Sequence, residues 1–178
     1  MANRQTDKVL FFGDLVTAVR TSAEGGLYPV GTKREEEGAT YRYVSMDSGA
    51  TAAVANKLAF RAGSGSGAWV VTATVANTAP NLSCGVFVSV IAASGYGWIQ
   101  TKGRVSALAT DGTDDIVKGD VLIETLATTG TVRLQIIATA DTAAAVLVQS
   151  KLIIHPVGVA LDADVNAANT VDCMVDFE

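Results

Sequence analysis

The feature that most constrains the fold of this chain is the two-residue period of its apolar side chains. In Thr170–Glu178 (TVDCMVDFE), Val171, Cys173, Val175 and Phe177 share one face, and three acidic residues and a methionine share the other. Successive side chains of a strand point to opposite sides, so this run predicts a strand with one buried and one wet face. No stretch of 12 or more residues follows the period of an amphipathic helix. The chain is therefore expected to be built from strands.

Four further stretches have strand character: Trp69–Val75, Gly85–Ala92, Thr131–Ala138 and Lys151–Leu161. Gly85–Ala92 is apolar on both faces, which indicates a central strand or one covered by a neighbouring subunit. Pro156 interrupts the last stretch and indicates an edge, a bulge or a kink between two strands, because proline cannot donate to a ladder. We expect an all-β fold, a compact antiparallel β-barrel or β-sandwich with a loop-rich N-terminal arm.

The stretch Tyr96–Leu108 (YGWIQTKGRVSAL) contains two alternating runs around Thr101–Gly103. Because glycine readily supplies the positive φ of a short turn, this pattern predicts a β-hairpin with Trp98 in its first strand. Two Ala-rich stretches, Thr51–Leu58 and Asp141–Val148, are compatible either with two turns of helix or with loops, since helices this short are marginal.

The spacing of the strands and turns suggests an arm followed by one domain. Residues 1–27 form the expected arm, and residues 28–178 form a β-rich domain. Within that domain, residues 28–65 are rich in loop-forming residues and residues 66–178 form the denser β core. The flexible sequence AGSGSG at 62–67 lies at the boundary between the two parts.

The charge of the chain bears on its partners. Charged residues make up 17% of the 178 residues, against roughly 25% in an average globular protein, and the net charge is −5. Thirteen Lys and Arg spread along an acidic chain do not favour nucleic-acid binding, and neither a basic membrane-surface patch nor a long apolar run is present. The N-terminus has no signal-peptide core, so we expect maturation in a cytoplasm, with Cys84 and Cys173 as free, buried thiols.

The residues that carry chemistry in other proteins are not arranged as a catalytic or metal site here. His155 is the only histidine and has no recognisable nucleophile or orienting partner, so a structural histidine is expected. The cluster Asp111, Asp114 and Asp115 lacks the glutamate and the helices of a calcium loop and is interpreted as turn residues. We therefore expect no enzyme activity, no cofactor and no metal.

Three segments of the chain together resemble a known family. They are Pro29–Ala50, with a Val-Gly-Thr step, an acidic turn and a Tyr-x-Tyr-Val strand; Tyr96–Leu108; and Val117–Glu124 (VKGDVLIE), followed by PVGVALDADV and a last strand. This order over residues 28–178 resembles the capsid decoration, or cement, proteins of tailed-phage heads. The motifs consist of glycines, turns and apolar alternation.

The resemblance implies a structural virion protein on the capsid surface, made in the host cytoplasm. Its expected partner is the major capsid protein, and homo-oligomers, with trimers favoured, are implied as well. Candidate contacts are the arm residues Phe11 and Phe12, the acidic run Glu35, Glu36 and Glu37, and Trp98. The acidic run is most simply interpreted as a solvated loop or the approach to a hairpin, with contact to a basic patch on a partner as the alternative. The arm is equally compatible with packing on its own barrel.

Two other functions are compatible with the sequence. A virion or cell-surface β-module, such as a head fibre or adhesin, would bind carbohydrate through an exposed aromatic shelf that includes Trp98. An enzyme of unrecognised type would need His155 to lie close to carboxylates such as Asp162 or Asp164.

Overall fold

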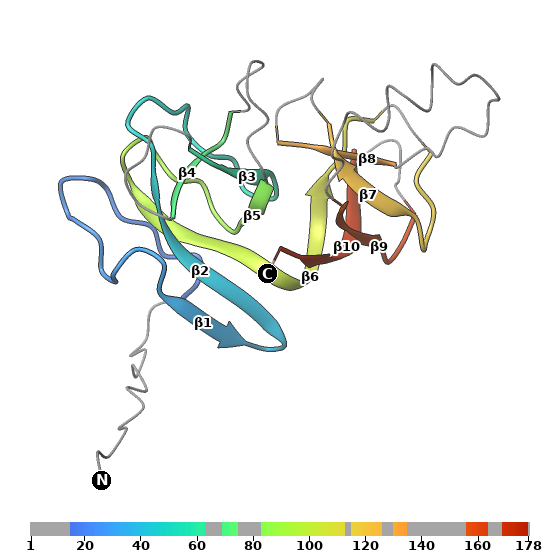
Figure 1. Ribbon diagram of the computed structural model, residues 1–178, viewed down its shortest axis with the longest axis horizontal. Coiled ribbons are helices and arrows are strands. Elements are labelled where there is room, and N and C mark those ends of the chain that lie inside the picture. Colours follow the sequence, from blue (N-terminus) through green and yellow to red (C-terminus); the bar gives the residue numbers. More distant parts are fainter. Residues whose placement is uncertain are drawn as a thin grey trace, which may run out of the picture.

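The computed structural model describes residues 15–62, 69–74, 83–112, 115–125, 130–134, 156–163 and 169–177. These residues form strands, turns and loops and no helix, which confirms the all-β prediction (Figure 1). None of them belongs to a helix long and apolar enough to cross a lipid bilayer. The strands are β1 (Lys33–Glu36), β2 (Ala39–Met46), β3 (Leu58–Arg61), β4 (Val70–Thr72), β5 (Ser83–Phe87), β6 (Tyr96–Ala109), β7 (Val121–Glu124), β8 (Val132–Leu134), β9 (Pro156–Ala160) and β10 (Thr170–Asp176).

Five strands close into a small barrel. Their order is β2-β4-β3-β5-β6, and pairing of β6 with β2 completes the ring. Four of the five pairings are antiparallel, but β2 and β4 are parallel, which the expected antiparallel architecture did not include. Closure protects the edges of these strands from wrong pairing. The interior is filled by apolar side chains, among them Val44, Met46, Ala59, Val71, Phe87, Ile91 and Ile99.

A second sheet extends from the barrel in the order β6-β10-β9-β7-β8. Its inner face packs on the outside of the barrel, because Leu58 and Phe60 of β3 and Val86 of β5 share one buried cluster with Val171 and Cys173 of β10. Neighbouring residues of β3 and β5 therefore serve two cores, one inside the barrel and one between the barrel and the second sheet. This explains why β5 is apolar on both faces, as the sequence indicated for Gly85–Ala92, although the strand ends at Phe87 and residues 88–92 form bends and loop.

Strand β6 joins the two parts and corrects the predicted hairpin. Tyr96–Ala109 is one continuous strand, curved in Figure 1, and no turn forms at Thr101–Gly103. Its first half pairs with β2 and its second half with β10. Gly103 does have a positive φ of 104°, and Thr101 lies at a bulge opposite β2, so the glycine bends the strand instead of reversing it.

The side chain of Gln100 holds the bend of β6. Its Nε2 donates to the backbone oxygens of Lys102 at 3.2 Å and Arg104 at 2.8 Å. Gln100 is buried, and these bonds satisfy two carbonyl groups where the strand leaves its regular pairing. A Cβ at position 103 would lie 2.9 Å from the Ala39 Cα, so glycine also permits the close approach of the β1–β2 turn.

The C-terminal strand agrees with its predicted alternation. In β10, Val171, Cys173 and Val175 are buried, and Met174 and Asp176 are exposed. Pro156 begins β9, which lies between β10 and β7 and is not an edge. The register between β7 and β9 shifts beside Pro156, which agrees with the bulge alternative, and residues 151–155 of the predicted stretch lie outside the described residues.

Two segments with ambiguous sequence patterns differ in outcome. Residues 51–57 form an irregular loop, so the loop alternative holds for most of Thr51–Leu58, whose last residue begins β3. Asp141–Val148 lies outside the described residues. Residues 28–65, expected to be rich in loops, supply β1, β2 and β3.

Candidate functional site

The acidic run identified in the sequence lies at the tip of the β1–β2 hairpin. Glu36 pairs with Ala39, which leaves Glu37 and Gly38 as a two-residue turn. Both turn residues have positive φ, 50° and 80°, the geometry of a type I′ turn, whose twist matches that of the strands it joins. The turn thereby places Glu35, Glu36 and Glu37 at the tip of the hairpin.

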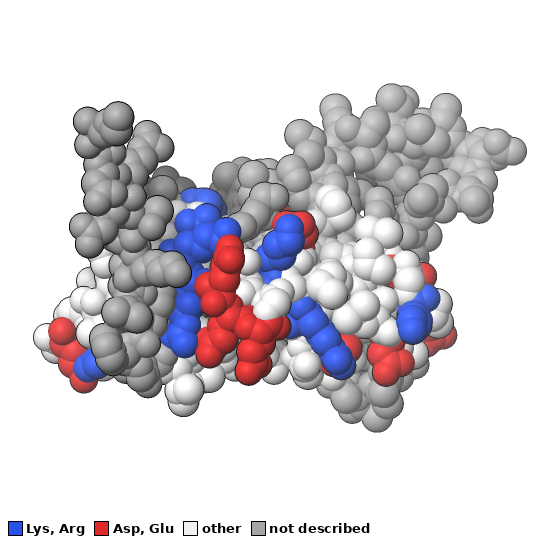
Figure 2. All heavy atoms as spheres, turned by 90° about the horizontal axis from the view of Figure 1, so that it is seen from below, with Lys and Arg blue, Asp and Glu red and all other residues white. Residues whose placement is uncertain are grey.

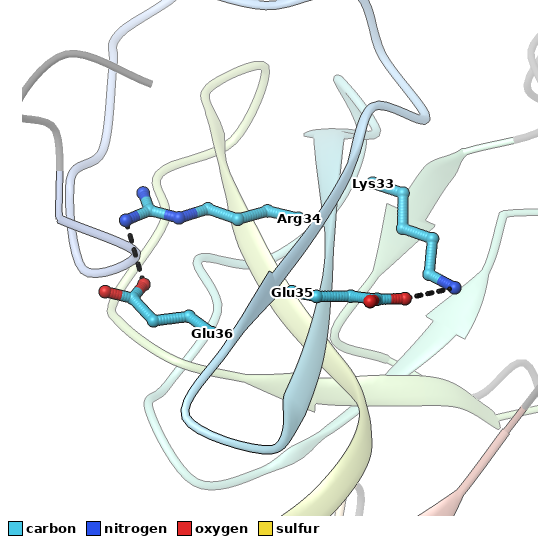
Figure 3. Close-up of a pocket in the computed structure, with 4 residues that line it drawn as sticks. All are labelled: Lys33, Arg34, Glu35 and Glu36. Carbon is cyan, nitrogen blue, oxygen red and sulfur yellow. Dashed lines mark ion pairs between the residues drawn. The ribbon is translucent and has the colours of Figure 1, made fainter. Parts of the chain in front are cut away.

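The charges of β1 are balanced within the strand. Lys33 Nζ lies 2.9 Å from Glu35 Oε1, and Arg34 Nη2 lies 2.8 Å from Glu36 Oε2. Because residues two apart share a face of a strand, one pair lies on each face, as Figure 3 shows. Figure 2 looks at the end of the molecule where this hairpin lies in Figure 1, and there acidic side chains gather between basic ones.

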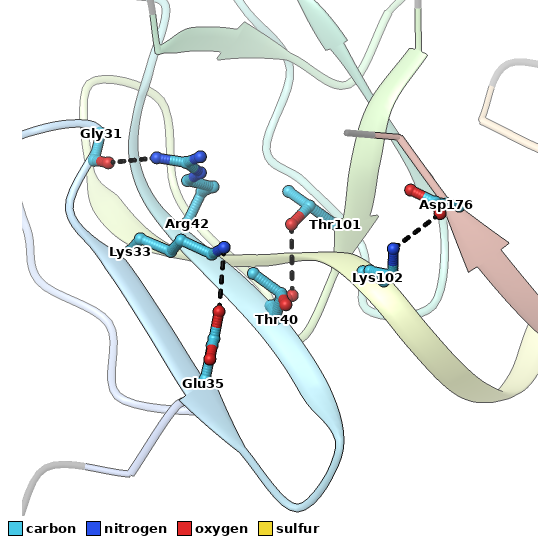
Figure 4. A network of polar contacts seen from close by, with 8 residues as sticks. All are labelled: Gly31, Lys33, Glu35, Thr40, Arg42, Thr101, Lys102 and Asp176. Carbon is cyan, nitrogen blue, oxygen red and sulfur yellow. Dashed lines mark hydrogen bonds and ion pairs between the residues drawn. The ribbon is translucent and has the colours of Figure 1, made fainter.

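Shallow hollows lie beside the hairpin. One of about 460 Å³ is lined by β1, and one of about 520 Å³ extends over the turn to Thr40 and Lys102. Lys102 Nζ donates to Asp176 Oδ2 at 2.9 Å, and Thr101 Oγ1 donates to the Thr40 oxygen at 3.3 Å (Figure 4). These bonds tie the hairpin, β6 and β10 together, through a buried contact at Thr101 and an exposed one at Lys102.

The pKa of Tyr41 on β2 is affected by the carboxylates of this hairpin. Burial raises the pKa of its phenol, and the nearby carboxylates of Glu36 and Glu37 raise it further. The phenol therefore stays protonated at neutral pH and keeps its hydrogen to donate.

Two guanidinium groups hold an indole beside the hairpin. The guanidinium carbon of Arg42 lies 4.9 Å from the centre of the Trp69 ring and that of Arg61 lies 4.1 Å from it. Arg42 Nη1 also donates to the Gly31 oxygen at 3.2 Å, shown in Figure 4. This stack fastens the start of the hairpin to the barrel through cation–π contacts.

Trp98 lies away from the acidic run, under the segment that precedes β1. It is 1% exposed and packs against Tyr43 and Tyr28, with ring centres 5.1 and 5.5 Å away. The Tyr43 hydroxyl accepts a hydrogen bond from the Leu27 N–H at 3.1 Å, and Arg20 bridges to Tyr96 through the backbone. A ligand could reach the Trp98 ring only if this covering segment moved.

A row of exposed apolar side chains crosses the outer face of the second sheet. Val121 lies opposite Val159, and Val159 lies opposite Met174. Val121 is 38% exposed, Val159 is 41% exposed and Met174 is 46% exposed. The sequence did not reveal this row, because it placed Met174 only on the wet face of its strand and the cross-strand register was unknown.

An ion pair borders the apolar row on β6. Arg104, which lies opposite Met174, has its Nη2 2.6 Å from Asp172 Oδ2. The hydrogen bond from Arg104, and a second from the Ala107 N–H, lower the pKa of the Asp172 carboxyl. Asp172 thereby also holds Ala107, whose φ of 59° is unusual for alanine, at the irregular register of β6 and β10.

The remaining predicted residues fall in different places. Phe11, Phe12, Asp114, His155 and Asp164 lie outside the described residues. Within the part of the chain that the structure describes, no cluster of three or more His, Cys, Asp or Glu side chains could hold a metal.

The two cysteines are free and buried, as predicted. Burial raises the pKa of each thiol, Cys84 and Cys173, to about 12. Cys84 lies in the barrel core and Cys173 in the core beneath the second sheet, so both act as apolar side chains.

Comparison of the chain with models of known protein families and with curated proteins finds no match.

Proposed function

We propose that this chain is a structural protein of a tailed-phage head that binds the outer surface of the capsid and stabilises contacts between major capsid subunits. The proposal starts from the resemblance of residues 28–178 to capsid decoration proteins. The all-β architecture is compatible with it, and the observation that carries it is the apolar row Val121–Val159–Met174.

This row has the composition of a protein-contact surface. Protein interfaces have a core depleted in charge and a polar rim, and here three apolar side chains lie beside the Arg104–Asp172 ion pair. The side chains stand on three paired strands and are held in place without ordering on contact, so little conformational entropy is lost on binding. A modest contact of this kind suffices on a shell, because many copies bind and each can bridge several subunits.

Co-sedimentation with empty capsid shells tests the proposal. We expect the wild-type protein to pellet with shells, and Val159→Glu to reduce its affinity about tenfold or more, because the variant places a charge in the centre of the contact. Val54→Glu is the matched control, since Val54 is 50% exposed in the loop before β3 and should leave binding unchanged.

The outcomes are distinct. Failure of the wild type to bind shells would overturn the capsid proposal. Binding that is equally strong in Val159→Glu would exclude the apolar row as the contact surface. Circular dichroism of each variant verifies that the fold is retained.

A further inference from the structure

A hollow lies where strand β6 leaves strand β5. The pairing of β5 with β6 extends as far as Gln100, which lies opposite Val86. Beyond this point β6 bends toward β10, and the Ala109 N–H donates to the Asn56 oxygen at 2.9 Å. Between these two attachments β6 runs apart from the end of β5, and the space between them is a hollow of about 240 Å³.

The lining of this hollow combines an apolar floor with a polar rim. Val86 and Val105 are buried and form the floor, above the core that the barrel shares with the second sheet. Asn56, Arg104 and Ser106 line the hollow as well and are exposed, so they form its rim. A ligand here would contact aliphatic groups below and hydrogen-bonding groups at the sides.

The lining has no uncompensated charge. Arg104 is the one charged residue among those that line the hollow, and its Nη2 lies 2.6 Å from Asp172 Oδ2. The guanidinium charge is therefore balanced by a neighbouring carboxylate. A neutral ligand fits this balance better than an anion or a cation.

The buried amide of Gln100 determines which hydrogen-bonding group a ligand must carry. Gln100 lines the hollow and is 8% exposed, and both N–H groups of its amide are used by the Lys102 and Arg104 oxygens. Within the described part of the chain, no group donates a hydrogen bond to its Oε1. Because a buried acceptor is costly without a donor, the ligand is expected to supply one.

We propose that this hollow binds one neutral sugar residue of a glycan. A sugar hydroxyl can donate to Gln100 Oε1, and neighbouring hydroxyls can bond to the Asn56 amide and the Ser106 hydroxyl. The C–H groups of the ring then lie on the valine floor. The hollow is smaller than the roughly 300–1,000 Å³ of sites for drug-sized ligands, which limits the ligand to a single ring.

The chemistry of the lining disfavours other small ligands. Phosphate and carboxylate groups accept hydrogen bonds and cannot pair with Gln100 Oε1, and a purely apolar molecule would leave this oxygen without a donor. The site also differs from the aromatic shelf at Trp98 that the sequence suggested, because the Trp98 ring is buried.

The inference does not rest on the capsid proposal, since it concerns a different ligand and a different set of contacts. Failure of sugar binding leaves the capsid proposal in place, and failure of capsid binding leaves the sugar site in place.

Nuclear magnetic resonance titration of the full, nitrogen-15-labelled chain tests the site. The probes are the methyl glycosides of glucose, galactose and mannose, each added up to about 100 mM, with acetamide as a small neutral amide for comparison. We expect at least one glycoside to shift the Gln100 side-chain amide signals and the Ser106 backbone amide signal in a saturable way. The expected dissociation constant is about 1–10 mM, because one small ring makes few contacts.

A matched pair of variants locates the binding. Ser106→Phe places a ring at the rim of the hollow and should weaken binding of the glycoside about tenfold or more. Ser48→Phe makes the same change at an exposed serine that does not line the hollow and should leave the dissociation constant unchanged. Circular dichroism of both variants verifies that the fold is retained.

Three results would overturn the inference. The first is the absence of saturable shifts with every glycoside, which is the behaviour of a hollow that holds water alone. The second is saturable binding of acetamide without binding of any glycoside, which would assign the hollow to an amide group. The third is equal affinity of the wild type and Ser106→Phe, which would place the sugar elsewhere on the molecule.

Discussion

The barrel and the second sheet are built from the same kind of strand but are stabilised differently. The barrel closes on itself and carries an aromatic cluster on its outer side, where Tyr28, Tyr43 and Trp98 pack beneath the segment before β1. The second sheet is open, and the buried residues it contributes are aliphatic side chains and Cys173. Its core is completed by Leu58, Phe60 and Val86 from the barrel, so the second sheet depends on the barrel for its packing.

The two parts also differ in where their exposed apolar side chains lie: around the barrel they lie in loops, as Val54 and Val90 do, whereas three of those in the second sheet lie on paired strands. Large rings on the barrel are covered by the chain itself, whereas the outer face of the second sheet leaves Val121, Val159 and Met174 exposed. The barrel is thus closed and covered by its own segment, whereas the second sheet is open and has a bare outer face. Substitutions in each part, and in the strand that joins them, test that division.

The largest effect is expected from Trp98→Ala. Removal of a fully buried indole from the aromatic cluster should lower the free energy of unfolding by about 3–5 kcal/mol, because the cavity is too large to close. Urea denaturation measures the loss. Trp69→Ala should lower the free energy of unfolding clearly less, because Trp69 is only partly buried. Equal losses at the two positions would show that burial in the aromatic cluster adds no stability.

Gly158→Ala should affect the second sheet more than the barrel. A Cβ at position 158 would overlap the Met174 backbone oxygen, so β9 and β10 would have to separate, at a cost of about 1–3 kcal/mol. Hydrogen exchange should increase in β9 and β10 before it increases in β2. Gly49→Ala is the control, since the nearest atom to its Cβ is 3.9 Å away.

Gln100→Ala tests the strand that joins the two parts. Loss of the two hydrogen bonds to the Lys102 and Arg104 oxygens should lower the free energy of unfolding by about 1–2 kcal/mol, because the carbonyl groups lose their partner. Faster amide exchange across 103–109 without a change in β2 would locate the effect at the bend. Unchanged amide exchange in this segment would contradict the inference that the Gln100 hydrogen bonds hold the bend.

The smallest effect is expected from Asp172→Asn, and it depends on pH. The pKa of Asp172 is lowered in the folded protein, so its contribution to stability is present above the ordinary value near 3.8 and is lost as pH falls through the folded value. At neutral pH the variant should be less stable by about 1 kcal/mol or less, since Arg104 is well exposed.

The comparison of wild type and Asp172→Asn is made by thermal unfolding between pH 7 and pH 2. The difference in unfolding temperature between the two proteins should remain constant above about pH 5 and become smaller below about pH 4. A difference in unfolding temperature that increases as the pH falls would contradict the lowered pKa of Asp172.

Much of the local structure could be predicted from the sequence, and the larger errors concern pairing. The alternation of β10 and the two apolar faces of β5 were predicted correctly, because both depend on which side each residue faces. The hairpin at Thr101–Gly103 was wrong, since a glycine with positive φ can either reverse or bend a strand. Here the strand bends because β2 and β10, which are distant from each other in sequence, pair with its two halves.

The candidate surface was foreseen in part. The acidic run Glu35–Glu37 was identified as a charge cluster, but its place on a terminal strand follows from the sheet order alone. Trp98 was identified as a notable aromatic, yet only its neighbours Tyr28 and Tyr43 show that its ring is buried. The row Val121–Val159–Met174 could not be seen, because its members are brought together by register.

The sequence by itself determined that the chain forms strands, which faces of them are buried and that both thiols are free and buried. These properties depend on local alternation and on the free energy of removing apolar side chains from water. Tertiary structure decided the closure of the barrel, the bend in β6 and the outward position of β1 and of the apolar row. Those features depend on hydrogen bonds between strands far apart in sequence, for which short-range periodicity carries no information.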